Sequence, residues 1–537
     1  LIFMSSRRRF IHHSILAAAG INTFLLSRCK DLTVQSKSEA TDVFNLDEVT
    51  IESLQKMYSA GSTSAEKVTQ AYLERIAAID QAGIKLNAII EINPDALLIA
   101  KALDAERKAG TIRGPLHGIP ILIKDNINTA DKMMTTAGAL ALVGNIASKD
   151  AFIVEKLRQA GVVLLGKTNL SEWANFRSTR SSSGWSSRGG QTKNPYVLDH
   201  SPCGSSSGSG SAVSANLCTI AIGTETDGSV ACPASINGVV GIKPTVGLWS
   251  RSGIIPISHT QDTAGPMART VTDAAVLLTA LQGKDPQDEA TNANPDSGLN
   301  YAKDLNLATM QGMRLGIDAS LLKRHEEIDD LLGKTLDLLR SNGAAIIEVD
   351  YMGPNGKIND PEFTVLKYEF KYGVEKYLQT ENFKYKTLKD IIQFNKDHKE
   401  EAMPYFQQEI LEQCAELGDL QTKEYLLALK NSHEVARIAI DSLLKQNKLN
   451  ALIGPATGAS WCIDKVNGDH WTGYGAYGIS AVAGYPSVTV PMGYIHELPI
   501  GLSFMGTAYD EQNLIKLAFA FEQLTKARRA PKFIPSI

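Results

Sequence analysis

Short apolar segments alternate with amphipathic ones along nearly the whole chain, from about residue 46 onward. The apolar runs have the length and composition of buried strands and lie at residues 119–123, 162–165, 219–222, 315–317, 344–349, 451–453 and 487–491. Between them, helical spacing of apolar residues occurs at 94–108, 151–160, 274–281, 328–339 and 511–526. This alternation predicts an α/β fold with one central mixed β-sheet and helices on both faces.

The organisation of the chain favours one large domain. A chain of 537 residues is long enough for several domains, but no internal repeat or central low-complexity linker divides it. We therefore predict a single domain over residues 46–530. Residues 351–427 are rich in Lys, Glu, Phe and Tyr and poor in β-branched runs, which predicts a mostly helical insertion that borders the functional site and helps to set specificity.

The N-terminal residues have the character of an export signal. Arg7, Arg8 and Arg9 precede a short apolar segment, which predicts a signal peptide of the twin-arginine type over residues 4–29. Cys29 ends this segment in a lipoprotein-like setting, although Arg28 stands where a small residue is expected. Residues 30–45 are polar and predict a linker. We expect a bacterial protein exported to the periplasm or cell envelope.

Charge and cysteine content limit the partners. A net charge of −4 provides no bulk attraction to nucleic acid, so we expect no nucleic-acid partner. Contact with a membrane is expected only through the N-terminal signal or a lipid on Cys29. Without Cys29, an odd number of the six cysteines remains, and none forms a C-x-x-C pair. We therefore expect no full disulfide framework, with the cysteines acting as small buried apolar residues.

Lys124 is the first candidate for chemistry, because it ends the apolar run at residues 119–123 and precedes Asp125. A lysine in this position can simply pair with a carboxylate. Alternatively, burial disfavours the ammonium form and lowers the pKa, which turns a lysine into a general base. The residue type alone leaves both interpretations open.

Two clusters of Gly and Ser follow, at residues 204–211 and 223–229. The first is typical of a flexible or anion-binding loop, and it lacks the Gly-Lys-Ser/Thr ending of a nucleotide-binding loop. Ser229 lies on a turn after the strand at 219–222, where backbone N–H groups can converge on one oxygen. Serine needs a base to become a nucleophile, so Lys124 and these clusters favour a serine amidohydrolase. The scattered histidines match no metal motif, and we expect no cofactor.

Seven motifs in fixed order resemble the amidase signature family, over residues of about 46–524: GPLHGIPILIKDNI (114–127), GKTNLSEWA (166–174), CGSSSGSG (203–210), GTETDGS (223–229), GVVGIKPT (238–245), DTAGPMART (262–270) and GYPSVTVPMG (484–493). The resemblance implies a histidine-free Ser–Ser–Lys triad. It assigns the base to Lys124, the bridging serine to Ser205, the nucleophile to Ser229 and a supporting hydrogen bond to Ser206. It also implies a cis peptide at Ser205 and an oxyanion hole of backbone N–H groups from Thr226, Asp227, Gly228 and Ser229.

Departures from the family pattern indicate the branch. Glu225 stands where the family often has Asp, Asp227 where it has Gly, and Ala231 where an arginine is common. These features are similar to the bacterial peptide amidase branch, which implies hydrolysis of peptide C-terminal carboxamides to the acid and ammonia through an acyl-enzyme on Ser229. Alternatives are a general amidase for small aryl or aliphatic amides, a catalytically silent binding protein on the same fold and, with less support, a tRNA amidotransferase subunit.

Overall fold

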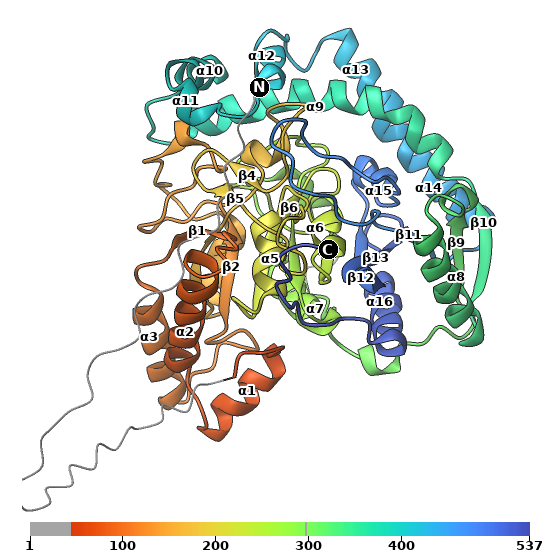
Figure 1. Cartoon of the computed structure of the whole chain (residues 1–537), viewed down its shortest axis with the longest axis horizontal. Coiled ribbons are helices and arrows are strands. Elements are labelled where there is room, and N and C mark those ends of the chain that lie inside the picture. Colours follow the sequence, from red (N-terminus) through yellow and green to blue (C-terminus); the bar gives the residue numbers. More distant parts are fainter. Residues whose placement is uncertain (1–44, 296–297) are drawn as a thin grey trace, which may run out of the picture. The chain divides into compact units, whose positions relative to one another are not determined.

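A mixed sheet of eleven strands forms the centre of the computed structural model, which describes residues 45–295 and 298–537 (Figure 1). These residues belong to one compact unit, Phe44–Ile537. The predicted signal peptide, Cys29 and all but the last residue of the linker lie outside the described residues. The predicted fold class, a mixed sheet flanked by helices, is confirmed.

The sheet has the strand order β1-β3-β2-β6-β8-β7-β12-β13-β11-β9-β10. Its strands are β1 (Ile89–Ile92), β2 (Pro120–Lys124), β3 (Val163–Thr168), β6 (Ile220–Glu225), β7 (Val240–Lys243), β8 (Thr263–Ala268), β9 (Arg314–Asp318), β10 (Ala345–Val349), β11 (Ala451–Pro455), β12 (Ser487–Ile495) and β13 (Leu498–Met505). Neighbours β3, β2 and β6 run parallel, as do β11, β9 and β10, and the other pairs are antiparallel. A separate hairpin pairs β4 (Trp185–Ser186) with β5 (Gly190–Gln191).

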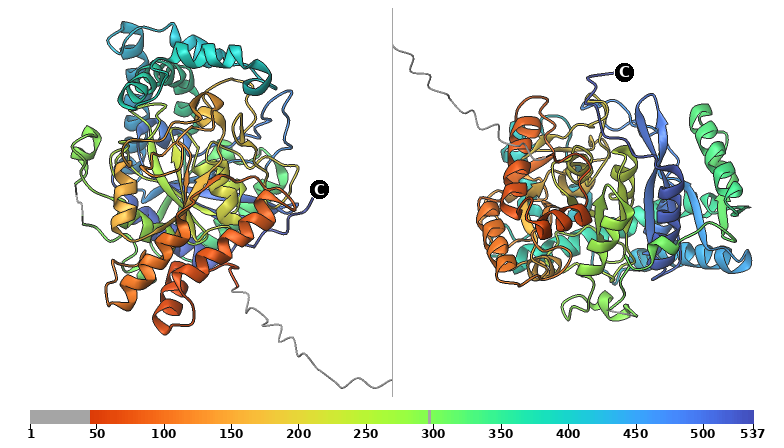
Figure 2. Two further views of the ribbon diagram at one scale, coloured as in Figure 1. Left: turned by 90° about the vertical axis from the view of Figure 1, so that its left-hand side faces the viewer. Right: turned by 90° about the horizontal axis from the view of Figure 1, so that it is seen from below.

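Helices pack along the whole sheet. In the first part of the chain they are α1 (Ile51–Ala60), α2 (Ala65–Arg75), α3 (Ala96–Lys108), α4 (Phe152–Gln159), α5 (Ser207–Ser214), α6 (Ala231–Ile236), α7 (Val271–Leu281) and α8 (Glu326–Ser341). Later helices are α9 (Met352–Thr380), α10 (Leu388–Asp397), α11 (Lys399–Ala402), α12 (Glu409–Ala415), α13 (Lys423–Leu429), α14 (Val435–Gln446), α15 (Gly478–Ala483) and α16 (Glu511–Thr525). Figure 2 shows α2 and α3 at the β1–β3 end and α8 toward β10.

The strands closest to the predicted site are fully buried, as their apolar sequences require. Every residue of β2, β3 and β6 is buried, so the run Ile121–Ile123 lies in the main core. The helix α5 begins at Ser207, within the first Gly/Ser cluster. Small residues permit this position, because a Cβ on Gly208 would lie only 2.2 Å from the Ala88 carbonyl oxygen.

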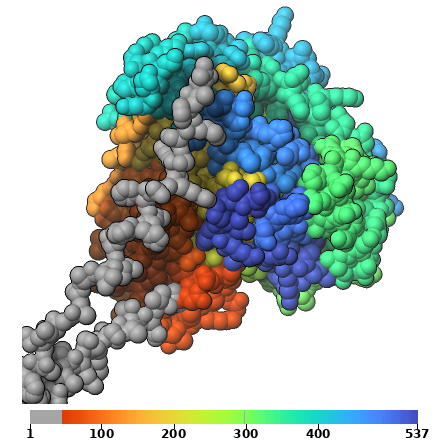
Figure 3. Space-filling model, in the orientation of Figure 1, coloured from red at the N-terminus to blue at the C-terminus, as the bar shows by residue number. Residues whose placement is uncertain are grey.

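Residues 351–427 are largely helical and contain α9 to α12 and most of α13. The long helix α9 packs against α12, α13, α14 and α15. Figure 3 shows the cyan residues, near residue 400, along the upper edge of the surface. Pro361 lies inside α9. No helix in the described residues is long and apolar enough to cross a membrane.

Candidate active site

Two neighbouring parallel strands bring the predicted site residues together. β2 ends at Lys124 and β6 ends at Glu225, and Ile123 is paired with Ile222 in the register between them. The segments that follow β2 and β6 therefore leave the sheet at the same edge. Loops beyond the carboxyl ends of parallel strands are a usual place for functional sites, since side chains from separate segments converge there.

Hydroxyl and carbonyl oxygens surround the Lys124 amine. Its Nζ lies 2.8 Å from Ser205 Oγ, 3.1 Å from Ser206 Oγ, 2.8 Å from Thr224 Oγ1 and 3.2 Å from the Thr224 carbonyl oxygen. Lys124, Ser205 and Ser206 are completely buried. Asn126 donates from Nδ2 to Thr224 Oγ1 at 3.1 Å, which ties the hydroxyl beside the amine to the segment after β2.

Lys124 has no carboxylate partner in the described residues, so the ordinary ion-pair interpretation of this lysine is wrong. Burial lowers the pKa of the Lys124 ammonium to about 7, against the opposing attraction of the more distant Asp262 and Glu225 carboxylates. An amine with this pKa is substantially neutral at neutral pH. A neutral amine has a lone pair that can accept the proton of the Ser205 hydroxyl.

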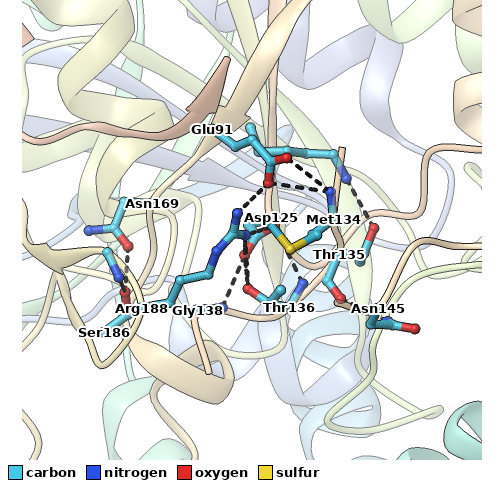
Figure 4. Close-up of polar contacts among 12 residues, drawn as sticks. Glu91, Asp125, Met134, Thr135, Thr136, Gly138, Asn145, Asn169, Ser186 and Arg188 are labelled. Carbon is cyan, nitrogen blue, oxygen red and sulfur yellow. Dashed lines mark hydrogen bonds and ion pairs between the residues drawn. The ribbon is translucent and has the colours of Figure 1, made fainter. Parts of the chain in front are cut away.

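The carboxylate next in sequence, Asp125, is bound elsewhere. It accepts hydrogen bonds from the Thr136 hydroxyl and, at 3.2 Å, from the Gly138 N–H, and it pairs with Arg188 Nη1 at 3.3 Å (Figure 4). Arg188 also pairs with Glu91. This buried network holds Asp125 within its own set of donors and anchors the chain that follows Lys124.

Ser205 and Ser206 begin the segment that leads into α5. The Gly204–Ser205 peptide is cis, which confirms the expectation for this position. Ser206 Oγ donates to the Thr224 carbonyl at 3.0 Å and accepts from the Thr224 N–H at 3.1 Å. Its side chain leaves no room for a Cβ at Gly223, where a methyl group would lie 2.7 Å from Ser206 Oγ. Ser206 therefore joins its loop to the end of β6.

Ser229 lies across from Ser205 on the turn between β6 and α6. The Ser206 N–H donates to the Ser229 carbonyl at 3.2 Å, so the two serine segments are joined through the main chain. In the described part of the chain no hydrogen bond joins the Ser229 hydroxyl to Ser205 or Lys124. Catalytic hydrogen bonds are often long in ligand-free enzymes and shorten when substrate binds.

Glycine and glutamate shape the turn that carries Ser229. Gly228 has a φ of +75°, and a Cβ there would lie 2.4 Å from the Tyr477 ring. Glu225 Oε2 accepts from the N–H groups of Val230 and Ala231 at 2.7 and 2.9 Å. These contacts fix both sides of the turn, whose backbone N–H groups are the predicted oxyanion donors of residues 226–229.

A disulfide links the two serine segments, and our expectation for the cysteines is wrong at this pair. Cys203 and Cys232 are joined, with Cα atoms 6.1 Å apart, two residues before Ser205 and three after Ser229. The odd number of cysteines after Cys29 did not reveal this pair. The other cysteines in the described residues are free: Cys218 and Cys414 are buried and Cys462 is exposed.

A cavity of about 640 Å³ lies beside the site. Thr224, Thr226 and Asn126 belong to its wall, whereas Lys124, Ser205 and Ser229 do not. The segment Ile254–Ile257 and the C-terminal part of α9 form much of the remaining lining. The helical segment that the sequence assigned to the border of the site therefore contributes directly to this cavity.

The sequence analysis did not identify the residues that contact Lys124 and Asp125 but belong to no recognised catalytic residue type. Thr224 lies within the GTETDGS motif, which could have indicated it, whereas Arg188 stands in a segment without a motif. Within residues 45–295 and 298–537, no group of three or more His, Cys, Asp or Glu side chains could hold a metal ion. The polar groups in contact with the Lys124 amine are hydroxyl and carbonyl oxygens.

Known proteins share this arrangement of the chain. A family model described as Amidase matches residues 67–515. A probable amidase of Arabidopsis thaliana is 40% identical over 526 residues, which cover 95% of this chain and 97% of the relative. The native peptide amidase of Stenotrophomonas maltophilia is similar in structure with a TM-score of 0.87 and 50% identity, covering 91% of this chain and 99% of that chain. An amidase family protein of Bacillus anthracis gives a TM-score of 0.81 at 37% identity, covering 91% and 93%. On these matches and its ordered motifs, the chain belongs to the amidase signature family and is an amidase.

Proposed function

We propose that this amidase removes the amide group from the C-terminus of peptides, with Ser229 as nucleophile, Ser205 as bridging serine and Lys124 as base. The observation that carries the mechanism is the buried Lys124 amine, bonded to Ser205 and free of any carboxylate in the described residues. The preference for peptides is supported by the similarity to the Stenotrophomonas maltophilia peptide amidase. A general amidase for small amides is the second candidate, because the similar plant protein is named only as a probable amidase.

The reaction begins with proton transfer through the two serines. Ser229 Oγ attacks the carboxamide carbon while its proton passes to Ser205 Oγ, whose own proton passes to the neutral Lys124 amine. The attack moves the carbonyl electron pair onto oxygen. Backbone N–H groups of Thr226, Asp227, Gly228 and Ser229 stabilise that oxyanion.

Collapse of the tetrahedral intermediate completes acylation. The C–N bond breaks, and the proton held by Lys124 returns through Ser205 to the departing nitrogen. Ammonia departs, and the acyl group remains on Ser229 as an ester. Water then attacks the ester and gives its proton to Lys124 through Ser205. The peptide acid departs, and the proton returns through Ser205 to Ser229, which is regenerated. Lys124 thus ends each half-reaction neutral, as it began.

The first test measures ammonia release from a blocked dipeptide amide and from a simple aryl amide. We expect the wild type to prefer the peptide amide, and Ser229→Ala to lose both activities. Ser252→Ala is the matched control, because Ser252 lines the neighbouring cavity without touching Lys124. Turnover of the aryl amide alone would favour the general amidase. Turnover of neither, without labelling of Ser229 by a fluorophosphonate, would favour the silent binding protein.

We also propose that the protein acts outside the cytoplasm. Support comes from the twin-arginine-like N-terminal sequence and from the Cys203–Cys232 disulfide, a bond typical of oxidising compartments. Replacement of Arg7 and Arg8 by lysine in the full chain should retain the protein in the cytoplasmic fraction. Equal amounts of wild type and variant in the periplasmic fraction would contradict the proposal.

A further inference from the structure

Asp227 differs from its neighbours on the nucleophile turn. Thr226 and Ser229 are each 7% exposed, whereas the side chain of Asp227 is exposed to solvent. It occupies the position where the family pattern has glycine, so this chain places a carboxyl group within the turn whose backbone N–H groups are assigned to the oxyanion.

Two other carboxylates lie near Asp227. The surrounding protein desolvates its carboxyl group, and this effect, together with the Glu362 and Glu225 carboxylates, raises the pKa of Asp227 well above its ordinary range. Asp227 is therefore a carboxyl that solvent reaches, on the same turn as Ser229 and near two further carboxylates.

Glu362, from α9, holds one side of this carboxyl. The Glu362 carboxyl lies close to that of Asp227, and the interaction between them contributes to the raised pKa of Asp227. Gln261 Nε2 donates to Glu362 Oε1 at 2.8 Å and to the Thr226 carbonyl at 3.4 Å. The pair is therefore built into the oxyanion turn, and α9 supplies its second member.

No cation neutralises Asp227. Among the described residues neither Asp227 nor Glu362 forms a salt bridge. The buried Lys243 attracts Asp227 from a distance, but its amine donates to the Tyr485 and Pro244 carbonyls at 2.8 and 3.2 Å. The raised pKa of Asp227 favours its neutral form, whose carbonyl oxygen can still accept a hydrogen bond from a donor on the substrate.

A peptide amide has such a donor at a fixed place. In a C-terminal carboxamide, one Cα atom separates the scissile carbonyl carbon from the backbone N–H of the same residue. Simple aliphatic and aryl amides have no N–H there. We propose that the Asp227 carboxyl accepts a hydrogen bond from the backbone N–H of the residue that bears the C-terminal carboxamide, and so selects peptide amides over simple amides.

This inference rests on the proposed peptide amidase function, and a matched pair of substrates separates the two. The pair is a blocked dipeptide amide and the depsipeptide amide in which an ester oxygen replaces that N–H; ammonia release gives kcat/KM for each. A hydrogen bond to a neutral acceptor is worth about 2- to 10-fold in kcat/KM. We expect wild type to prefer the N–H substrate by about this factor and Asp227→Ala to prefer neither.

Asp360→Ala is the control, because it removes an exposed carboxylate from α9 two residues from Glu362 and should keep the preference. If Asp227→Ala does not fold, Asp227→Asn retains an acceptor oxygen and should show a reduced but measurable preference. An unchanged preference in the Asp227 variants would overturn the inference while leaving the peptide amidase proposal intact. Failure of wild type to hydrolyse the dipeptide amide would instead overturn the proposed function.

Discussion

Protonation of Lys124 should switch off acylation of Ser229 in a pH range set by burial. With a pKa of about 7, about half of the amine is neutral at pH 7, about 10% at pH 6 and about 1% at pH 5. Only the neutral form can accept a proton from Ser205. The acylation rate should therefore fall about tenfold per pH unit below about pH 6 and reach a plateau above about pH 8.

The assay is the second-order rate of Ser229 labelling by a fluorophosphonate from about pH 5 to about pH 9, because the reagent has no group that titrates there. Thr224→Val then tests the assignment to Lys124. The Thr224 hydroxyl accepts a hydrogen bond from the amine and so favours the ammonium form. Its removal should lower the apparent pKa by up to about one unit.

Glu362→Gln is the control for this profile, since burial raises the pKa of Glu362 to about 7, within the same range. If the profile belongs to Lys124, the Gln variant should leave the apparent pKa almost unchanged. A labelling rate that does not vary between about pH 5 and about pH 8 would refute the reasoning. A shift to higher pKa in Thr224→Val would refute it as well.

Three further changes have defined outcomes. Ser205→Ala should lower kcat for a peptide amide by about 10²- to 10⁴-fold with an unchanged circular dichroism spectrum, because it removes the bridge to the base; a loss below about tenfold would contradict the relay. Replacement of both Cys203 and Cys232 by Ala should lower the free energy of unfolding by about 3–4 kcal/mol in urea titrations, as the disulfide spans 29 residues, whereas Cys462→Ala should change little. Burial lowers the pKa of Lys167 to about 8, so the unfolded chain binds more protons between about pH 8 and about pH 10 and wild-type stability rises with pH there. In the same titrations, the stability of Lys167→Met relative to wild type should therefore decline by up to about 3 kcal/mol from pH 7 to pH 10, and a constant difference would be inconsistent with a buried neutralised amine.

The sequence was sufficient to predict the strands β2 and β6, which lead into the site, and to locate Lys124 at a strand end. The run at residues 119–123 is apolar throughout, and a segment of this kind is stable only when both faces are buried. Because β2 and β6 are both such segments, their carboxyl ends could be expected at one edge of the sheet. Local composition was enough for this inference, since burial of a strand depends on the strand's own residues.

Partners from distant segments could not be predicted in the same way. Glu362 is separated from Asp227 by more than a hundred residues and lies on a helix without any motif. The Cys203–Cys232 bond depends on the convergence of two loops, which no count of cysteines reveals. Strands β1, β7, β8 and β13 were also missed: β1 has only four residues, and the other three contain Gly or Pro, which weaken the sequence signal of a strand.

The hydrogen bonds made by the carboxylates around Lys124 explain why this amine can be neutral in a chain with many acidic residues. Each acid near the amine is occupied by other donors: Asp125 by Arg188 and Thr136, Glu225 by the N–H groups after Ser229, and Asp262 by the Ser258 N–H at 2.9 Å. None of them contacts the amine in the described residues. Desolvation therefore outweighs the attraction of these charges, and the pKa of Lys124 falls to about 7. A carboxylate released from its own donors toward Lys124 would restore the ammonium and remove the proposed base, so these structural hydrogen bonds are a condition of the proposed chemistry at Ser229.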